Sequence, residues 1–181
     1  MILYLDTNVI LARYSRREPG HPDAKRLITN IEAGNADAVT SILTLVEIVS
    51  ATSRAYDRYE GESPLVKRGD ASGSFLKRVA NLNNLRFIPL GGDISLNIGE
   101  GTLELPALFA VALETGSKTG LKTLGNIHIA SALIASRIYG QKMDYFVTLD
   151  EDIIIHREEI LATTGIKVTK PDKVVLENPG A

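Results

Sequence analysis

The sequence predicts an α/β fold, in which a central parallel sheet of about five short strands is flanked by helices on both faces. Short apolar runs alternate with longer segments of helical periodicity, which is typical of parallel strands joined by helices. The 181 residues contain no internal repeat, low-complexity tract or linker. A chain of this length buries roughly 70% of its unfolded surface, enough for an independent core. We therefore expect a single domain spanning residues 1–181.

The first half of the chain is expected to supply three strands and the helices between them. In the second helical segment, apolar residues recur at helical spacing and Gly34 follows as a helix-ending residue. Residues 58–72 are polar and glycine-bearing, so we expect a loop there. The expected elements are a strand at Ile2–Leu5, helices at Val9–Arg17 and Asp23–Ala33, a strand at Ala36–Thr40, helices at Ser41–Tyr56 and Ser74–Asn83, and a strand at Leu85–Pro89.

The second half is expected to be mainly helical until the last two strands. After a glycine pair, residues 93–139 are predicted to form two or three helices, separated near 99–102 and 116–120. The remaining elements are a fourth strand at Asp144–Leu149, a helix at Glu151–Leu161 and a fifth strand at Ile166–Thr169.

Composition excludes several classes of protein. The chain has no cysteine, which removes disulfides, thiolate zinc sites and cysteine nucleophiles. Its longest apolar stretch, around Leu105–Leu113, is far shorter than the roughly 20 residues of a membrane helix. The N-terminus also lacks the basic lead-in of a signal peptide, so we expect a cytoplasmic protein without membrane contact. With a net charge of −2, any RNA contact would depend on a local patch or a metal ion.

Three acidic residues fall where parallel sheets bind ligands, beyond the carboxyl ends of the strands. Asp6 and Asp150 each follow an apolar run, and Glu47 lies in an apolar helix after the second strand. Each also has a purely structural explanation. The aspartates could cap helices, and Glu47 could close a capping box with Thr44. Because an unpaired buried carboxylate is costly, a bound cation near Glu47 is the alternative.

A metal ion would explain why these acids are gathered. Two unit charges about 4 Å apart repel by about 4 kcal/mol at an effective dielectric constant near 20. Mg²⁺ or Mn²⁺ reverses the sign of that energy, since both prefer oxygen ligands. Their typical chemistry with several carboxylates is phosphodiester hydrolysis. We therefore expect Asp6, Glu47 and Asp150 to be catalytic residues that bind Mg²⁺ or Mn²⁺.

Other polar residues near the acids are weaker candidates. Thr7, Asn8 and Thr148 could hydrogen-bond the acids, or be ordinary turn and strand residues. His128 lies in an apolar segment and is predicted to be a core histidine rather than a catalytic base.

Two groups of basic residues could contact RNA phosphates. Arg13, Arg16 and Arg17 follow Asp6 at helical spacing, although a solvated helix face explains them as well. The second group is interleaved with acids and is the weaker candidate; it consists of Arg54, Arg58, Lys67 and Arg68.

Four segments of the chain resemble motifs of the PIN domain, the small nuclease fold of VapC-type toxins in prokaryotic toxin–antitoxin pairs. Their order matches that of the family: Tyr4–Leu11, Thr44–Ile48, Tyr145–Asp152 and Val168–Pro171. The resemblance implies a Mg²⁺- or Mn²⁺-dependent ribonuclease with an RNA substrate. It further implies a homodimer and a cognate antitoxin protein.

In this chain, the segment that corresponds to the third motif of that family departs from the usual pattern. The segment Gly120–Ala130 resembles the stretch where PIN domains usually carry an aspartate, and the alignment of the motif puts Gly125 in its place. A site of four carboxylates would then fall to three, which weakens metal binding. Asn126 could offer an amide oxygen instead, and Asp152 could move in.

Two functional hypotheses follow from this departure. The first is a VapC-like ribonuclease that is weakened or inactive through the loss of one acid. The second is a PIN-fold module that binds RNA or a protein without cutting. A phosphatase or phosphotransfer domain fits less well, because Asn8 stands where the haloacid-dehalogenase pattern has a second aspartate.

Overall fold

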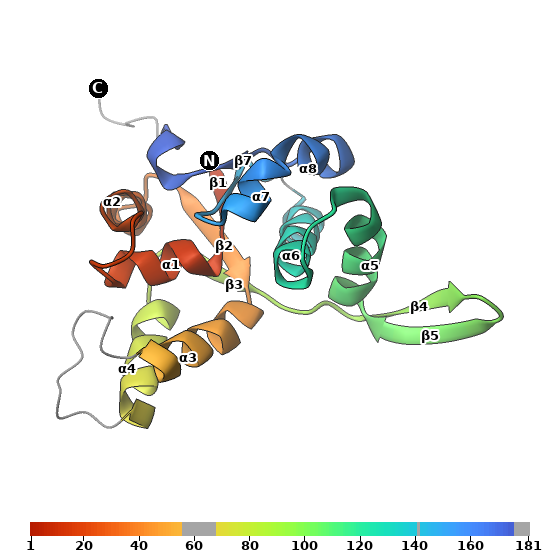
Figure 1. The fold of residues 1–181 in the computed structure, drawn as a ribbon, viewed down its shortest axis with the longest axis horizontal. Helices are drawn as coiled ribbons and strands as arrows, with labels where there is room; N and C mark the ends of the chain where they lie inside the picture. The colour runs from red at the N-terminus through yellow and green to blue at the C-terminus, as the bar shows by residue number, and fades with distance from the viewer. Residues whose placement is uncertain (56–67, 141, 176–181) are drawn as a thin grey trace.

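The centre of the fold is a five-stranded parallel sheet (Figure 1). The computed structural model describes residues 1–55, 68–140 and 142–175. Within them the strand order is β3-β2-β1-β6-β7, and all neighbouring strands are parallel. The predicted α/β class is confirmed. The strands are β1 (Ile2–Leu5), β2 (Asp37–Ser41), β3 (Leu85–Ile88), β6 (Tyr145–Val147) and β7 (Val168–Thr169).

Strand β1 lies in the middle of this sheet and is buried along its whole length. Successive side chains of a strand point to opposite faces. Leu3 and Leu5 therefore join one apolar core, while Ile2 and Tyr4 join the other. A strand covered on both faces needs a continuous apolar run, which these four residues provide.

Helices cover both faces of the sheet. In the described part of the chain, each of the two apolar cores receives side chains from four helices. No helix in that part is long and apolar enough to cross a membrane. The first core is covered by α1 (Thr7–Tyr14), α2 (His21–Glu32), α3 (Leu43–Ala55) and α4 (Arg68–Ala80). The second is covered by α5 (Ala107–Thr119), α6 (Thr123–Tyr139), α7 (Glu151–Ile155) and α8 (Arg157–Thr164), and a 3₁₀ turn at Pro171–Lys173 follows β7.

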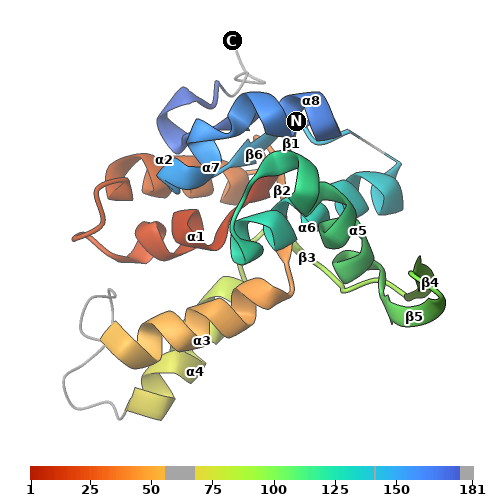
Figure 2. The same ribbon diagram turned by 45° about the vertical axis from the view of Figure 1, so that its right-hand side comes forward.

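A β-hairpin replaces part of the predicted helical region, so the prediction of helices throughout 93–139 is wrong. Strands β4 (Asp93–Ile98) and β5 (Gly101–Pro106) pair in antiparallel register and project from the base of α5 (Figures 1 and 2). Apolar and polar residues alternate along both strands, which is the period-two pattern of a strand with one apolar face. Gly99 in the turn has a positive φ of 61°, a conformation that glycine adopts at little cost.

Several further predictions differ in their boundaries. The helix predicted at Val9–Arg17 runs over Thr7–Tyr14, and the helix predicted at Ser74–Asn83 runs over Arg68–Ala80. The predicted loop over 58–72 is wrong for 68–72, because these residues begin α4; residues 58–67 lie outside the described ones. The predicted helix Glu151–Leu161 is two helices, α7 and α8, which meet at His156.

The strand order determines where a ligand site can form. Strands β2 and β3 extend to one side of β1, and β6 and β7 extend to the other. Open α/β sheets bind ligands where the strand order reverses, beyond the carboxyl ends of the strands. Asp6 follows β1 directly, and Asp150 lies shortly after β6. Both aspartates therefore lie at the same edge of the sheet, next to the point of reversal.

Candidate active site

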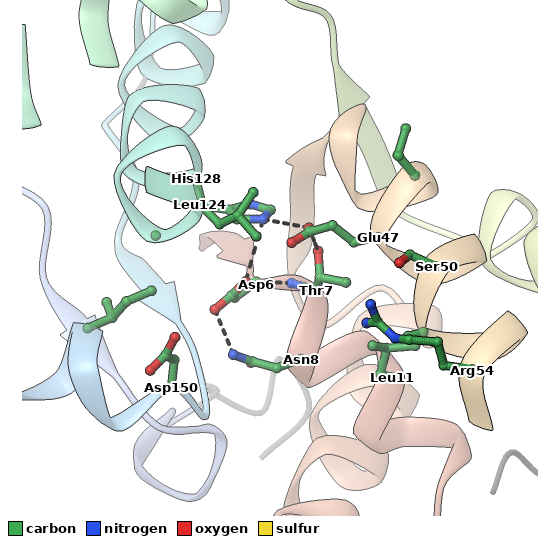
Figure 3. Close-up of a pocket in the computed structure, with 14 residues that line it drawn as sticks. Asp6, Thr7, Asn8, Leu11, Glu47, Ser50, Arg54, Leu124, His128 and Asp150 are labelled. Carbon is green, nitrogen blue, oxygen red and sulfur yellow. Dashed lines mark hydrogen bonds and ion pairs between the residues drawn. The ribbon is translucent and has the colours of Figure 1, made fainter. Parts of the chain in front are cut away.

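A pocket of about 420 Å³ opens at this edge of the sheet (Figure 3). The structure brings the three predicted acids together there, since Asp6, Glu47 and Asp150 all line it. They come from three segments: the end of β1, helix α3 and the start of α7. The pocket thus combines side chains that lie far apart in the sequence.

Asp6 is buried, with 5% of its surface exposed, and its carboxylate is held by three donors. It caps α1, and its Oδ1 accepts a hydrogen bond from the Thr7 amide at 2.7 Å. Its Oδ2 accepts from Asn8 Nδ2 at 2.8 Å and from Thr148 Oγ1 at 2.6 Å. Burial raises the pKa of Asp6 above its ordinary value, although the charge of His128 and the bond from Thr148 act in the opposite direction. Asp6 therefore does cap helix α1, and the same carboxylate also lines the pocket.

Thr148 and Asn8 tie the end of β6 to the start of α1. Besides donating to Asp6, Thr148 Oγ1 accepts from the Asp150 amide at 2.9 Å. The Asn8 side chain donates to Thr148 Oγ1 at 3.1 Å and accepts from the Leu149 amide at 2.9 Å. These bonds fix the two aspartate-bearing segments relative to each other.

Glu47 is held by His128 and Thr7. Its Oε2 accepts from His128 Nε2 at 2.8 Å and from Thr7 Oγ1 at 2.5 Å. The predicted capping box is not what holds it, because the Thr44 hydroxyl bonds Thr7 and Thr40 instead. Burial raises the pKa of Glu47, but the hydrogen bond and charge of His128 outweigh this effect and leave the pKa below its ordinary value.

His128 lies between Glu47 and a tyrosine behind it. The Tyr4 hydroxyl accepts from the Ser41 amide at 3.1 Å and lies 2.8 Å from His128 Nδ1, to which it can donate its proton. In the neutral ring Nδ1 is then the acceptor and Nε2 carries the hydrogen that faces Glu47, whereas in the protonated ring both nitrogens donate. Burial lowers the pKa of His128, but the hydrogen bond to Glu47 and the charges of Asp6 and Glu47 outweigh burial and raise the pKa.

The prediction that His128 is buried is confirmed, since only 3% of its surface is exposed. It is more than a core residue, however, because it lines the pocket and contacts Glu47. The sequence did carry a signal, since residues three apart share one face of a helix. His128 lies three positions after Gly125, which also lines the pocket.

Asp150 and the two auxiliary candidates have different surroundings. Asp150 is exposed and caps α7, where its Oδ1 accepts from the Asp152 amide at 2.9 Å. The Asp152 carboxylate does not line the pocket and lies 3.6 Å from Lys122 Nζ. Asn126 is buried away from the pocket, where its amide bonds Thr115 Oγ1 at 2.8 Å and the carbonyl of α5 residue 112. The structure therefore does not bring Asn126 and Asp152 to the three acids.

Of the predicted basic residues, Arg13, Arg16 and Arg17 do not line the pocket, whereas Arg54 of the weaker second group does. Arg13 lies 3.9 Å from Glu32 and above the ring of Tyr14. Arg16 and Arg17 are exposed on the segment after α1. Among the described residues, Arg54 is the one arginine or lysine that lines the pocket. Arg54 lies seven residues after Glu47 and therefore on the same face of α3. This spacing is the feature of the sequence that indicates its place in the pocket.

Gly125 lies in the first turn of α6 and forms part of the pocket wall. A Cβ added at this position would lie 3.3 Å from two side-chain carbons of Ile153. A larger residue at 125 would therefore need a small shift of Ile153. Any side chain placed there would enter the same pocket as the three acids.

The oxygen donors of the pocket fit a metal ion that keeps part of its water shell. Within residues 1–55, 68–140 and 142–175, no three His, Asp or Glu side chains lie close enough together to hold one as they stand. Mg²⁺, however, is commonly bound by one or two carboxylates together with water and substrate phosphate. Asp6 Oδ1 accepts one hydrogen bond and keeps a second lone pair, and Asp150 is exposed. These oxygen donors fit a hydrated Mg²⁺ or Mn²⁺ ion better than a closed protein cage.

The comparison with protein families agrees with this arrangement. The model of the PIN domain matches residues 3–159. The chain belongs to the PIN domain family. PIN domains are generally metal-dependent nucleases that use divalent ions such as Mg²⁺ or Mn²⁺. The comparison with curated proteins found no match.

Proposed function

We propose that this PIN domain is a Mg²⁺- or Mn²⁺-dependent ribonuclease of the VapC-like toxin kind, which hydrolyses RNA phosphodiester bonds. The observation that carries the proposal is the meeting of Asp6, Glu47 and Asp150 in one pocket at the reversal point of the sheet. Arg54 lines the same pocket. Carboxylates that can bind a metal ion therefore lie near a guanidinium that can bind an RNA phosphate.

Each residue of the pocket has a distinct task in this proposal. Asp6, Asp150 and Glu47 would hold the ion. When bound, a divalent ion supplies the positive charge that activates water and stabilises a leaving oxygen. Asn8 and Thr148 keep the Asp6 carboxylate oriented, and His128 keeps Glu47 in place.

Arg54 is proposed to bind an RNA phosphate next to the acids. A guanidinium can donate two parallel hydrogen bonds to a phosphate, which both binds and orients it. This local cation compensates for a chain whose net charge is −2. Steering of RNA to the pocket therefore depends on Arg54 and the bound ion rather than on overall charge.

A second candidate function is favoured by Gly125. The pocket wall at this position carries no side chain, and the described acids do not form a ready three-ligand group. A PIN fold with a weakened metal site could bind RNA or a protein without cutting it. In either case we propose, from the family resemblance, a cytoplasmic homodimer with a cognate antitoxin partner.

Cleavage of single-stranded RNA with Mn²⁺ tests the proposal. The unmodified chain should cut, Asp6→Asn should lose nearly all activity, and Asp37→Asn should retain it. Asp37 is a matched control because it is an exposed aspartate at the opposite, amino end of β2. Equal cleavage by the unmodified chain and Asp6→Asn would sink the assignment of Asp6.

Gly125→Asp separates the two candidate functions. If cleavage appears only in Gly125→Asp, the chain is a non-cutting PIN module. If the unmodified chain cuts well, the non-cutting alternative fails. Calorimetric titration with Mn²⁺ gives the stoichiometry of the ion in both proteins, independently of cleavage.

A further inference from the structure

The Nε2 atom of His128 faces two of the acids of the pocket (Figure 3). It lies 2.8 Å from Glu47 Oε2 and 3.8 Å from Asp6 Oδ1. Two ligands that are each about 2.1 Å from an octahedral ion lie about 3 Å apart when they are adjacent and about 4 Å apart when they are opposite. Both distances from Nε2 therefore fall within the range that separates ligands of a single ion.

The ring of His128 is held from behind, which gives Nε2 a defined direction. Tyr4 Oη lies 2.8 Å from Nδ1, and the two rings meet edge to face with their centroids 6.0 Å apart. Tyr4 is itself fully buried and stacks on Phe146 with a centroid distance of 4.9 Å. Histidines that bind metals are typically oriented in this way, through a hydrogen bond from the ring nitrogen that does not touch the ion.

The tautomer of His128 determines whether Nε2 can bind an ion. A ring nitrogen that carries a hydrogen is a donor and has no lone pair for a metal. Nε2 carries the hydrogen when Tyr4 donates to Nδ1. The same positions of the atoms also allow the opposite arrangement, in which Nδ1 donates to the Tyr4 hydroxyl and Nε2 presents its lone pair to the pocket. Tyr4 must then donate its own hydrogen to another acceptor.

Ser131 supplies that acceptor. It lies three positions after His128 and therefore on the same face of α6. Its side chain is buried, and its Oγ has no hydrogen-bond partner among the described residues. Burial raises the pKa of Tyr4 well above its ordinary value, whereas the Ser131 side chain lowers it, so the two hydroxyls are neighbours. A Tyr4 hydroxyl that donates to Ser131 gives this buried oxygen a partner and leaves the lone pair on Nε2.

This second arrangement requires a cation in the pocket, because a lone pair on Nε2 would otherwise face two carboxylates. Divalent first-row metal ions accept nitrogen and oxygen ligands together. Among the described side chains no three form a ready metal cage, so one of the ligands has to close in. Asp6 is held by three donors, whereas the Glu47 side chain is 25% exposed and can adjust.

We propose that His128 is a metal ligand of this PIN domain and binds the divalent ion through Nε2, together with the three acids of the pocket. This assignment rests on the proposed function, because it adds a ligand to the same ion. Helix α6 would then supply its ligand one turn after Gly125, where the side chain is missing. An imidazole among the ligands should shift the preference of the site from Mg²⁺ towards ions such as Ni²⁺.

Pulsed electron paramagnetic resonance of bound Mn²⁺ tests the ligand directly. The spin echo of the unmodified chain should be modulated by a coordinated ¹⁴N nucleus, and labelling of the histidines alone with ¹⁵N should replace this modulation by that of ¹⁵N. The modulation should be lost in His128→Gln and kept in His21→Gln, because His21 does not line the pocket. The labelling experiment needs no variant, so it decides the question even if His128→Gln does not fold.

The outcomes separate this assignment from the proposed function. Bound Mn²⁺ without a signal from a histidine nitrogen would overturn the role of His128 and leave the acidic metal site in place. A chain that binds no Mn²⁺ would overturn both.

Metal preference distinguishes a ligand from a residue that only positions Glu47. Calorimetric titrations of the untagged chain give its affinities for Ni²⁺ and Mg²⁺. His128→Gln should weaken Ni²⁺ binding by about tenfold or more, as expected for a group of a metal site. Mg²⁺ binding should fall much less, because Mg²⁺ prefers oxygen ligands. Equal losses for the two ions would show that His128 acts only through Glu47 and would overturn the proposal.

Discussion

The imidazole of His128 lies 2.8 Å from the carboxylate of Glu47, 81 positions away in the chain. The same Nε2 is 3.8 Å from Asp6 Oδ1. The positive charge favoured on His128 therefore faces two of the three acids of the pocket. Part of the repulsion between these carboxylates is relieved by a protein side chain, which explains how the pocket can fold around them.

The His128–Glu47 pair predicts a specific dependence of stability on pH. The folded-state pKa of His128 lies above its ordinary value of 6.5, so its contribution is full below that pH and is lost as the pH rises through the raised value. The pKa of Glu47 lies below 4.5, so its contribution is lost only as the pH falls through the lowered value. The free energy of unfolding should therefore decline as the pH rises above 6.5.

Urea unfolding between about pH 6 and about pH 9 measures this decline. His128→Gln should flatten the curve over this range, because the titrating group is gone. His21→Gln is the control, since His21 lies outside the pocket and should leave the decline in place. An unchanged decline in His128→Gln would show that another group is responsible.

Thr148→Val should destabilise the fold through Asp6. Valine keeps the shape of threonine but removes the donor to Asp6 Oδ2 and the acceptor for the Asp150 amide. Asp6 Oδ2 would keep only its bond from Asn8 and the Asp150 amide would lose its partner, which should lower the free energy of unfolding by about 1–3 kcal/mol. Thr119→Val should cost less, because that buried hydroxyl bonds only a carbonyl of its own helix among the described contacts. Equal losses in chemical denaturation would contradict the special role of Thr148.

Gly125→Asp should strengthen Mn²⁺ binding. The position is in the first turn of α6, where a carboxylate is favoured by the helix dipole, and it faces the pocket. We expect calorimetry to show tighter binding by about tenfold or more, typical for one group of a metal site. Gly125→Asn is the matched control, since it adds nearly the same volume without the charge.

The added side chain also has a steric consequence that can be measured separately. A Cβ at 125 would meet Ile153 at 3.3 Å, so Gly125→Asp alone should fit tightly. Combining it with Ile153→Val removes one methyl group of that neighbour and should raise the melting temperature relative to Gly125→Asp alone. No such recovery would mean that the helix adjusts without strain.

Arg54→Ala should weaken RNA binding more than Arg13→Ala. Arg54 lines the pocket, whereas Arg13 packs on Tyr14 near Glu32. Loss of one phosphate contact on a single strand should reduce the slope of log affinity against log salt by about 0.7. Fluorescence anisotropy with labelled RNA in Ca²⁺, to limit cleavage, measures both affinity and slope. Equal losses in both variants would contradict the proposed phosphate contact.

Much of the fold could be predicted because its strands are short apolar runs followed by polar residues. Ile2–Leu5 is recognisable as a buried strand, and an aspartate directly after it lies by necessity at the sheet edge. The hairpin of β4 and β5 could not be recognised from apolar content alone, since Leu103 and Leu105 fit a helical pattern together with the residues of α5. Only the alternation with polar residues distinguishes the period of two of a strand from the period of 3.6 of a helix.

The site could be predicted only in part, for a similar reason. Asp6, Glu47 and Asp150 lie beside strands or helix starts, where local sequence determines their position. The helical spacing puts His128 on the same face of α6 as Gly125, but the contact of His128 with Glu47 depends on the packing of α6 beside the sheet, which no local pattern specifies. The side chain of Asn126 in α6 hydrogen-bonds α5, and this contact likewise depends on the packing of the two helices against each other.

The Asp6–Thr148 hydrogen bond determines when the pocket can form while the chain is being synthesised. Asp6 is synthesised before its partner Thr148, which follows 142 residues later in the chain. A ribosome-bound chain that has not reached β6 holds Asp6 and Glu47 but lacks both Thr148 and Asp150. Whatever chemistry the pocket performs is therefore silent in the growing polypeptide until residues 148–150 have been made.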